Sequence, residues 1–220
     1  GEEDSRLTFG ISSKETETIL QDSTISVQGG FGSVALSLQG GAAEIVDSEM
    51  HKGVSSNFSY LIRGDSTSLT LKKVLLTSKE SSDSVGIELK GSEANIDSAV
   101  LVLFAGEEQA RGILLESDSS IDLDKSIVAF PLGSDIEPAK AGNTVAVYED
   151  SSSRVRLRDN TFVGADIILH TAEGEERTNI EELEKARPPY DQKNPHSGNE
   201  EEEIEGFFTD PEAGDFTPAR

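Results

Sequence analysis

The strongest constraint on the fold is a set of apolar columns that recur about every 25 residues. One column reads Leu20, Ile45, Leu71, Ile96, Leu123 and Leu157. The residue five positions later is also apolar each time: Ile25, Met50, Leu76, Leu101, Val128 and Phe162. A solenoid buries such columns by stacking one coil on the next, so the chain is expected to be a repeat protein.

Short strands, rather than helices, fit the pattern inside each repeat. An earlier segment of every repeat carries two apolar residues spaced by two, which point the same way in a strand. These pairs are Phe9/Ile11, Leu36/Leu38, Tyr60/Ile62, Ile87/Leu89, Ile113/Leu115 and Val145/Val147. An antiparallel sandwich would need hairpin turns and would leave the columns unexplained. We therefore expect parallel strands stacked coil on coil.

A third column, three residues after the first, is small or polar: Ser23, Ser48, Val74, Ala99, Ser126 and Asn160. Hydroxyl and amide groups buried at a bend are expected to hydrogen-bond along the stack, where they satisfy backbone groups that no strand ladder reaches. A catalytic serine would need a histidine nearby. The three histidines, His51, His170 and His196, fall in turns or in the tail, so a structural role is favoured.

The coil pattern of residues 112–117 and 121–128 resembles the right-handed parallel β-helix of the pectate-lyase-like superfamily. Residues 207–216 resemble a segment that often closes such helices in bacterial surface and secreted proteins. The resemblance covers about residues 5–170 and the tail motif. It implies an all-β, single-stranded parallel β-helix of about six coils, located outside a bacterial cell or on its surface. Relatives with this fold include polysaccharide lyases and glycosidases.

Residues 1–170 are assigned to the coils and residues 171–220 to a cap helix, an acidic linker and a tail. A short helix is expected over residues 178–186, with Thr178 or Asn179 as the N-cap. Residues 190–205 are polar and acidic and are expected to be exposed linker. Three phenylalanines then follow, and we expect them to fold back over the first strands of the coils: Phe207, Phe208 and Phe216. The longest insertion between coils, residues 131–144, is a further place where function could reside.

Composition excludes several kinds of partner. The net charge of −23 repels nucleic acid and anionic membranes. No cysteine is present, which excludes disulfides and thiolate metal sites. No run approaches the roughly 18 apolar residues of a membrane span. The resemblance to surface and secreted β-helices implies a polysaccharide or a surface protein as the partner, and the oligomeric state stays open.

Side chains facing outward between the apolar pairs are the candidate site residues. If the chain is an enzyme, Arg63, Lys90 and Glu88 are the catalytic candidates, although a simple ion pair of Glu88 with both bases across neighbouring coils is the favoured explanation. A glycosidase needs two suitably spaced carboxylates, and a calcium-dependent lyase needs an acidic cluster. Leu61 and Leu114, expected on the outer face, are candidates for partner contact, as is Tyr148.

Acidic residues after the first column alternate with Lys72, Lys125 and Arg158, which is typical of a solvated charge ladder. Asp97 and Asp124 are nevertheless candidates to share a calcium ion, and no other cofactor is expected. Three functions remain. The first is a non-catalytic surface protein that binds a glycan or a protein; the second is a polysaccharide lyase or glycoside hydrolase; the third is a spacer in a larger adhesin.

Overall fold

The fold is taken from a computed structural model of the 220-residue chain. The structure describes residues 7–28, 31–54, 57–79, 83–104, 109–131, 143–171, 173–185, 196–202, 207–210 and 215–219. Most of the insertion expected to carry function, residues 132–142, therefore lies outside the described residues, as do residues 211–214 of the tail motif.

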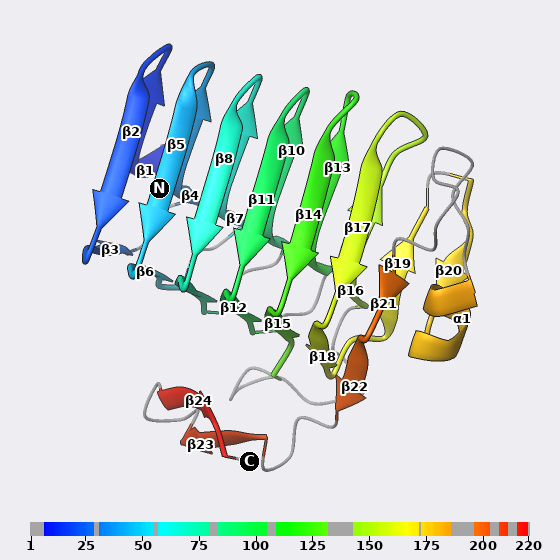
Figure 1. The fold of residues 1–220 in the computed structure, drawn as a ribbon. Helices are drawn as coiled ribbons and strands as arrows, with labels where there is room; N and C mark the ends of the chain where they lie inside the picture. Colours follow the sequence, from blue (N-terminus) through cyan, green and yellow to red (C-terminus); the bar gives the residue numbers. More distant parts are fainter. Residues whose placement is uncertain are drawn as a thin grey trace.

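Three parallel sheets run along the molecule and enclose one core (Figure 1). The first contains β1 (Leu7–Lys14), β4 (Gly32–Gln39), β7 (Phe58–Asp65), β10 (Asp83–Lys90), β13 (Ala110–Glu116), β16 (Thr144–Glu149) and β19 (Ile167–His170). The second contains β2 (Glu17–Gln21), β5 (Ala42–Val46), β8 (Ser68–Lys72), β11 (Glu93–Asp97), β14 (Ser120–Asp124), β17 (Arg154–Arg158) and β21 (His196–Ser197). The third contains β3 (Thr24–Val27), β6 (Glu49–Lys52), β9 (Leu75–Ser78), β12 (Val100–Leu103), β15 (Ile127–Ala129), β18 (Thr161–Val163) and β22 (Glu200–Glu202).

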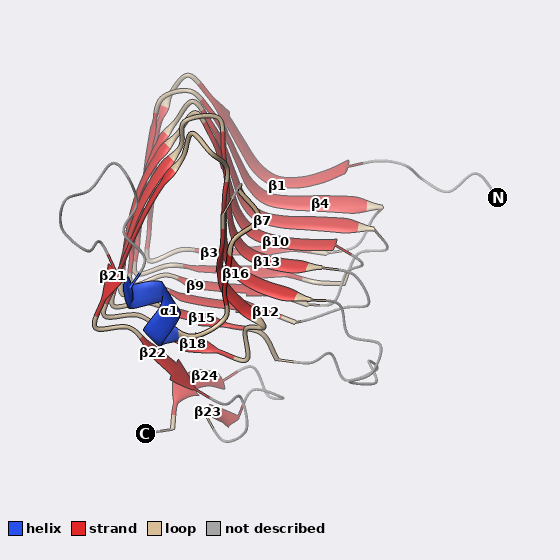
Figure 2. Cartoon of the chain, turned by 90° about the vertical axis from the view of Figure 1, so that its right-hand side faces the viewer, coloured by secondary structure: helices blue, strands red, loops and turns tan. Residues whose placement is uncertain are grey.

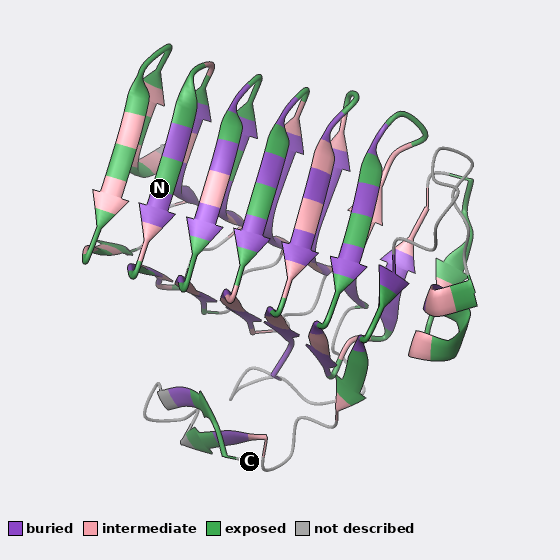
Figure 3. Ribbon diagram, in the orientation of Figure 1, coloured by how far each residue is buried: buried purple, intermediate pink, exposed green. Residues whose placement is uncertain are grey.

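The parallel solenoid predicted from the columns is confirmed. Each residue of the first column pairs with the next across neighbouring strands of the second sheet, from Leu20 opposite Ile45 through to Leu123 opposite Leu157. Buried and exposed residues alternate along these strands (Figure 3). The coil count differs slightly from the expected six, because β21 and β22 arise from residues that were expected to be linker.

The polar column forms the expected hydrogen-bonded ladder at the bend between the second and third sheets. Ser48 Oγ accepts from the backbone N–H of Ser23 at 3.1 Å, and Ser126 Oγ accepts from that of Ala99 at 3.1 Å. Further along, Asn160 Oδ1 accepts from Ser126 N at 2.9 Å, and Asn199 Oδ1 accepts from Asn160 N at 3.1 Å. Each donor belongs to one coil and each acceptor to the next, so these side chains link neighbouring coils by hydrogen bonds.

The strands of the first sheet bend partway along their length (Figure 2). At the bend two successive residues are both buried, as Leu61 and Ile62 show with no exposed surface. The expectation that Leu61 lies on the outer face is therefore wrong. The register shows that the apolar pairs Phe9/Ile11, Tyr60/Ile62 and Val145/Val147 were placed two residues too early. The outward column between the inward positions instead reads Ser12, Ser37, Arg63, Glu88, Leu114, Tyr148 and His170.

A short helix closes the carboxyl end of the stack. Helix α1 spans Ile180–Lys185, slightly shorter than expected, and Asn179 Oδ1 caps it by accepting from Glu182 N at 2.9 Å. Leu183 is fully buried against the core, and Ile180 packs beside it. The two-residue strand β20 (Glu176–Arg177) pairs antiparallel with β19. The helix and this strand together cover the last coil.

The carboxyl-terminal tail folds back, but over the third sheet rather than the first. Its hairpin consists of β23 (Phe208–Asp210) and β24 (Asp215–Pro218). Phe208 and Phe216 pack against outward residues of three neighbouring strands: Val102, Ala129 and Val163. The outward positions of β3 and β6 are polar instead, with Thr24, Ser26, Glu49 and His51. The switch from polar to apolar along the outer side of the third sheet determines where the hairpin lies.

Deleting residues 206–220 should expose this apolar strip. We expect a rise in the fluorescence of a hydrophobic dye and a loss of roughly 2 kcal/mol in the free energy of unfolding, because two largely buried phenylalanines are removed. The measurement is dye binding together with urea unfolding, compared with Phe216→Leu, which keeps an apolar side chain. Unchanged dye binding and unchanged protease resistance would show that the hairpin does not protect the third sheet.

The amino-terminal end of the stack has no equivalent cover among the described residues. Strands β1, β2 and β3 are the edge strands of their sheets at this end. Their inward residues Ile11, Leu20 and Ile25 are only partly buried, whereas the same columns are fully buried in the next coil. Phe9 is 47% exposed and Ile19 is 62% exposed. This edge is therefore both apolar and open.

Candidate ligand-binding face

The outward column of the first sheet brings together side chains from successive coils. Arg63 lies opposite Glu88, Glu88 opposite Leu114, Leu114 opposite Tyr148, and Tyr148 opposite His170. Two residues further along the strands, Lys90 lies opposite Glu116. We call these seven residues the outer face: Arg63, Glu88, Lys90, Leu114, Glu116, Tyr148 and His170. The face is built on strands whose alternate residues form the core, so its side chains stand on a rigid support.

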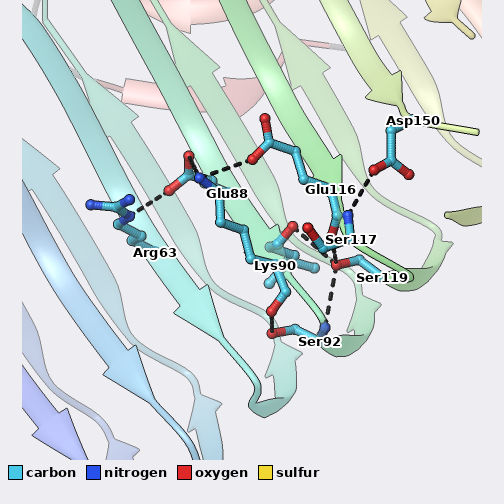
Figure 4. A network of polar contacts seen from close by, with 9 residues as sticks. Arg63, Glu88, Lys90, Ser92, Glu116, Ser117, Ser119 and Asp150 are labelled. Atoms are coloured by element: carbon cyan, nitrogen blue, oxygen red, sulfur yellow. Dashed lines mark hydrogen bonds and ion pairs between the residues drawn. The ribbon is translucent and has the colours of Figure 1, made fainter. Parts of the chain in front are cut away.

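Glu88 is the centre of a charged row on the outer face (Figure 4). Its Oε2 lies 2.5 Å from Arg63 Nε, as an ion pair without good hydrogen-bond alignment. Its Oε1 lies 3.5 Å from Lys90 Nζ, which also contacts Glu116 Oε2 at 2.9 Å. The predicted pairing of Glu88 with both bases is thus confirmed. The Glu88 side chain is only 5% exposed, so its neighbours shield it from water.

A serine corner fixes the backbone beneath this row. Ser92 Oγ donates to Lys90 O at 2.8 Å, and Ser119 Oγ donates to Glu116 O at 2.6 Å. Ser119 Oγ also accepts from Ser92 N at 3.2 Å, which links the two coils (Figure 4). These bonds hold the ends of β10 and β13 at a constant spacing, so Lys90 and Glu116 remain in register.

Lys90 is held in its charged form. Its hydrogen bond to Glu116 raises the pKa of the Lys90 ammonium, with a further contribution from the charge of Glu88. A lysine that acts as a general base must instead have a lowered pKa so that it is neutral near the working pH. Lys90 therefore suits a structural or binding role better than proton abstraction.

An aromatic stack continues the outer face toward the carboxyl end. The rings of Tyr148 and His170 lie 4.7 Å apart between centroids, with 13° between their planes. Both side chains are partly exposed, and His170 Nε2 lies 3.8 Å from Glu176 Oε1. At the other end, the Arg63 guanidinium lies 5.6 Å above the Tyr60 ring. Burial, followed by the charge of Glu88, raises the pKa of the Tyr60 phenol, which stays protonated.

The remaining predicted site residues have different surroundings. Leu114 belongs to the outer face but is only 8% exposed, and Leu61 is in the core. Neither offers the exposed apolar patch that protein docking would require. Asp97 and Asp124 lie opposite each other on the outer side of the second sheet, where Lys125 Nζ contacts Asp124 Oδ2 at 3.3 Å. Within the described ranges, no three His, Cys, Asp or Glu side chains gather as a metal site.

A second polar arrangement lies on the outer side of the third sheet. His51 Nδ1 lies 2.8 Å from Thr77 Oγ1, and His51 Nε2 lies 3.0 Å from Glu49 Oε2. The order hydroxyl, imidazole, carboxylate is that of a nucleophilic triad. Such a triad also needs backbone N–H groups aimed at an oxyanion, and the strand that carries Thr77 is paired with neighbours on both sides. The arrangement is therefore a surface hydrogen-bond chain.

Neither His170 nor Glu116 is among the candidate site residues predicted from the sequence. The contact of Glu116 with Lys90 is found only in the structure. His170 was assigned to a turn, although its position two residues after Ile168 on a final strand continues the column of Tyr148. Counting each coil from the residue after the bend would have identified both.

Among the residues described, no helix has the length and apolar character that crossing a membrane requires. Comparison with models of protein families, with curated proteins and with solved structures finds no match for this chain.

Proposed function

We propose that the chain is a non-catalytic protein that binds a glycan along its outer face. The observation that supports this most directly is the partly exposed stack of Tyr148 and His170, in line with the row of paired charges. Aromatic rings present a flat apolar surface with polar atoms at the edge, which suits the faces of a sugar ring. The carboxylates of Glu88 and Glu116 can accept hydrogen bonds from sugar hydroxyls.

The charged row supports binding rather than cleavage. Both carboxylates near Lys90 are paired with cations, and the raised pKa of Lys90 makes this residue unsuitable as the neutral base of a lyase. The enzyme alternative rests on the closeness of Glu88 and Glu116, which both contact Lys90. A glycosidase uses two such carboxylates, but one of them must remain protonated to act as the acid.

Burial of Leu61 and Leu114 favours a glycan over a protein as the ligand, because a protein interface usually has an exposed apolar centre. The coil pattern of residues 112–117 and 121–128 resembles that of pectate-lyase-like β-helices, many of which act on polysaccharides. By analogy with these proteins, the proposal places the chain outside the cell or on the surface of a bacterium.

Replacing Tyr148 with alanine should weaken glycan retention about tenfold, because the stacking surface is removed while the strand stays in place. The measurement is retention on immobilised neutral and acidic polysaccharides, with and without calcium, alongside release of reducing ends and of unsaturated products. Tyr148→Phe, which keeps the ring, should bind like the parent chain.

Cleavage of any polysaccharide would replace the proposal with the enzyme alternative and direct mutation to Glu88, Lys90 and Arg63. Absence of both retention and cleavage would overturn glycan binding and favour a spacer. Retention that Tyr148→Ala leaves unchanged would move the ligand away from the outer face.

A further inference from the structure

We infer, on the premise of the proposed glycan binding, that the outer face takes an uncharged glycan rather than an acidic one. Recognition of a carboxylate or sulfate group on a sugar needs a cation that is free to pair with it. Both cations of the outer face, Arg63 and Lys90, are instead paired with carboxylates of the chain itself. This pairing leaves the face suited to ligands whose polar groups are hydroxyls.

Glu88 is the internal counter-ion that the two cations share. Its Oε2 lies 2.5 Å from Arg63 Nε and its Oε1 lies 3.5 Å from Lys90 Nζ, while the side chain is only 5% exposed. A carboxylate on a ligand would have to displace Glu88 from both cations. The displaced carboxylate would then be left largely buried without its partners, which is strongly unfavourable. The position of Glu88 therefore discriminates against negative charge on the ligand.

The pair of Lys90 and Glu116 is the accessible part of the charged row, and it fits hydroxyl groups. The two side chains are 37% and 38% exposed, and Lys90 Nζ lies 2.9 Å from Glu116 Oε2. An ammonium group only donates hydrogen bonds and a carboxylate only accepts them, whereas a sugar hydroxyl does both. Neighbouring hydroxyls of one sugar ring can therefore accept from Lys90 and donate to Glu116 without separating the ion pair.

The charges around the outer face act in the same direction. Strands β7, β10, β13, β16 and β19 carry five acidic residues against three Lys or Arg residues. The third of these bases, Arg111, is also paired: its Nη1 lies 3.8 Å from Asp83 Oδ1, and its Nε donates to Gln109 Oε1 at 2.8 Å. Together with the net charge of −23, this excess of carboxylates repels an anionic polymer. An uncharged glycan can reach the Tyr148 ring without that repulsion.

The parent chain tests the preference directly. Retention is compared on immobilised neutral glucans, mannans and xylans and on polygalacturonate, with a chelator present so that calcium cannot bridge like charges. We expect a neutral glycan to be retained about tenfold more strongly than polygalacturonate. Its retention should hardly change between about 50 and 500 mM salt, because no ion pair forms between the ligand and the chain.

Glu116→Gln tests whether the internal pairing sets the preference. The change removes one carboxylate from Lys90, so that its ammonium is partly free for a ligand carboxylate, and it should raise the retention of polygalacturonate about threefold to tenfold. Glu44→Gln is the matched control. It removes the same charge from the chain and takes away a carboxylate 3.7 Å from Lys72 on the second sheet, so it should leave the retention of polygalacturonate as in the parent chain.

Two results would overturn the inference while leaving glycan binding in place. The first is a parent chain that retains polygalacturonate at least as well as any neutral glycan, with retention that Tyr148→Ala abolishes. The second is an equal gain for Glu116→Gln and Glu44→Gln, which would assign the preference to net charge and not to the pairing of Lys90. Failure of the proposed function itself has a different signature, because no glycan of either class would then be retained, and this result would overturn both.

Discussion

Replacing Asn160 with alanine is expected to lower the free energy of unfolding by roughly 3–5 kcal/mol, the largest effect of any single change considered for this chain. Asn160 is fully buried at the corner between the second and third sheets. Its Oδ1 accepts from Ser126 N at 2.9 Å, and its Nδ2 donates to Leu123 O at 2.9 Å and to Asn199 Oδ1 at 3.1 Å. Truncation leaves these groups buried without their partner, which costs about 1–3 kcal/mol for each.

Ser23→Ala is the matched control, because Ser23 belongs to the same column at the open end of the stack. Its hydroxyl donates to Gln21 O at 2.8 Å in exposed surroundings, where water can replace it. Urea unfolding followed by circular dichroism should therefore show a large shift for Asn160→Ala and a small one for Ser23→Ala. Equal shifts would mean that the ladder contributes through shape alone, as Val74 and Ala99 do in the same column.

Replacing Glu149 with glutamine should stabilise the chain by roughly 2–3 kcal/mol at pH 8. Glu149 follows Leu89 and Leu115 in an inward column, and its Oε2 has no hydrogen-bond partner among the described residues. Burial, followed by the charges of Glu173 and Asp150, raises its pKa from 4.5 to about 7. The upper end of the range is reduced because the side chain is still partly exposed to solvent.

The sign of the pH dependence follows from this shift. Between pH 4.5 and about 7 the folded chain keeps a proton on Glu149 that the unfolded chain releases, so stability falls as pH rises through this window. Glu149→Gln removes that slope and should match the parent chain at pH 4. Glu93→Gln, on the exposed side of the second sheet, is the control and should leave the slope unchanged. A parent chain that is more stable than Glu149→Gln at pH 8 would contradict the prediction.

His196 produces the opposite slope at the same end of the stack. Burial lowers the pKa of the His196 imidazole from 6.5 to about 4. Between these pH values the imidazole is neutral in the folded chain and protonated in the unfolded chain. Stability is therefore lost as pH falls from 6.5 to about 4. The two windows overlap, and the parent chain should show a shallower pH dependence than Glu149→Gln, in which only the acid-side loss remains.

Most of the fold could be predicted from the sequence, because every coil of a solenoid buries apolar residues at equivalent positions. The columns through Leu20 and Ile25 predicted the second and third sheets. The strands of the second sheet alternate between core and solvent, and the column through Ile25 points into the core at the same place in every coil. The first sheet was read with a two-residue error in three coils. Its strands bend where Leu61 and Ile62 are both buried, and a bend breaks the alternation on which the register depends.

The register error in the first sheet also affects the candidate site, because it gives Leu61 the wrong orientation. Strict alternation predicts that Leu61 faces outward, because it lies between two apolar residues, Tyr60 and Ile62. Alternation alone does not show that the strand bends there. The ion pair of Glu88 with Arg63 and Lys90 was still found, because opposite charges in neighbouring coils pair in either register. The destination of the tail could not be predicted, because Phe208 fits any apolar strip and only the register identifies Val102 and Val163 as outward.

The carboxyl end of the stack is covered by α1 and the hairpin, whereas no described residue covers β1–β3. This difference implies that unfolding has a preferred direction. In a linear array each coil is held by its neighbours, and the first described coil has one neighbour among the described residues. Denaturant or a pulling force should therefore unzip the chain from β1–β3 inward, while α1 and the hairpin lock the last coils in place.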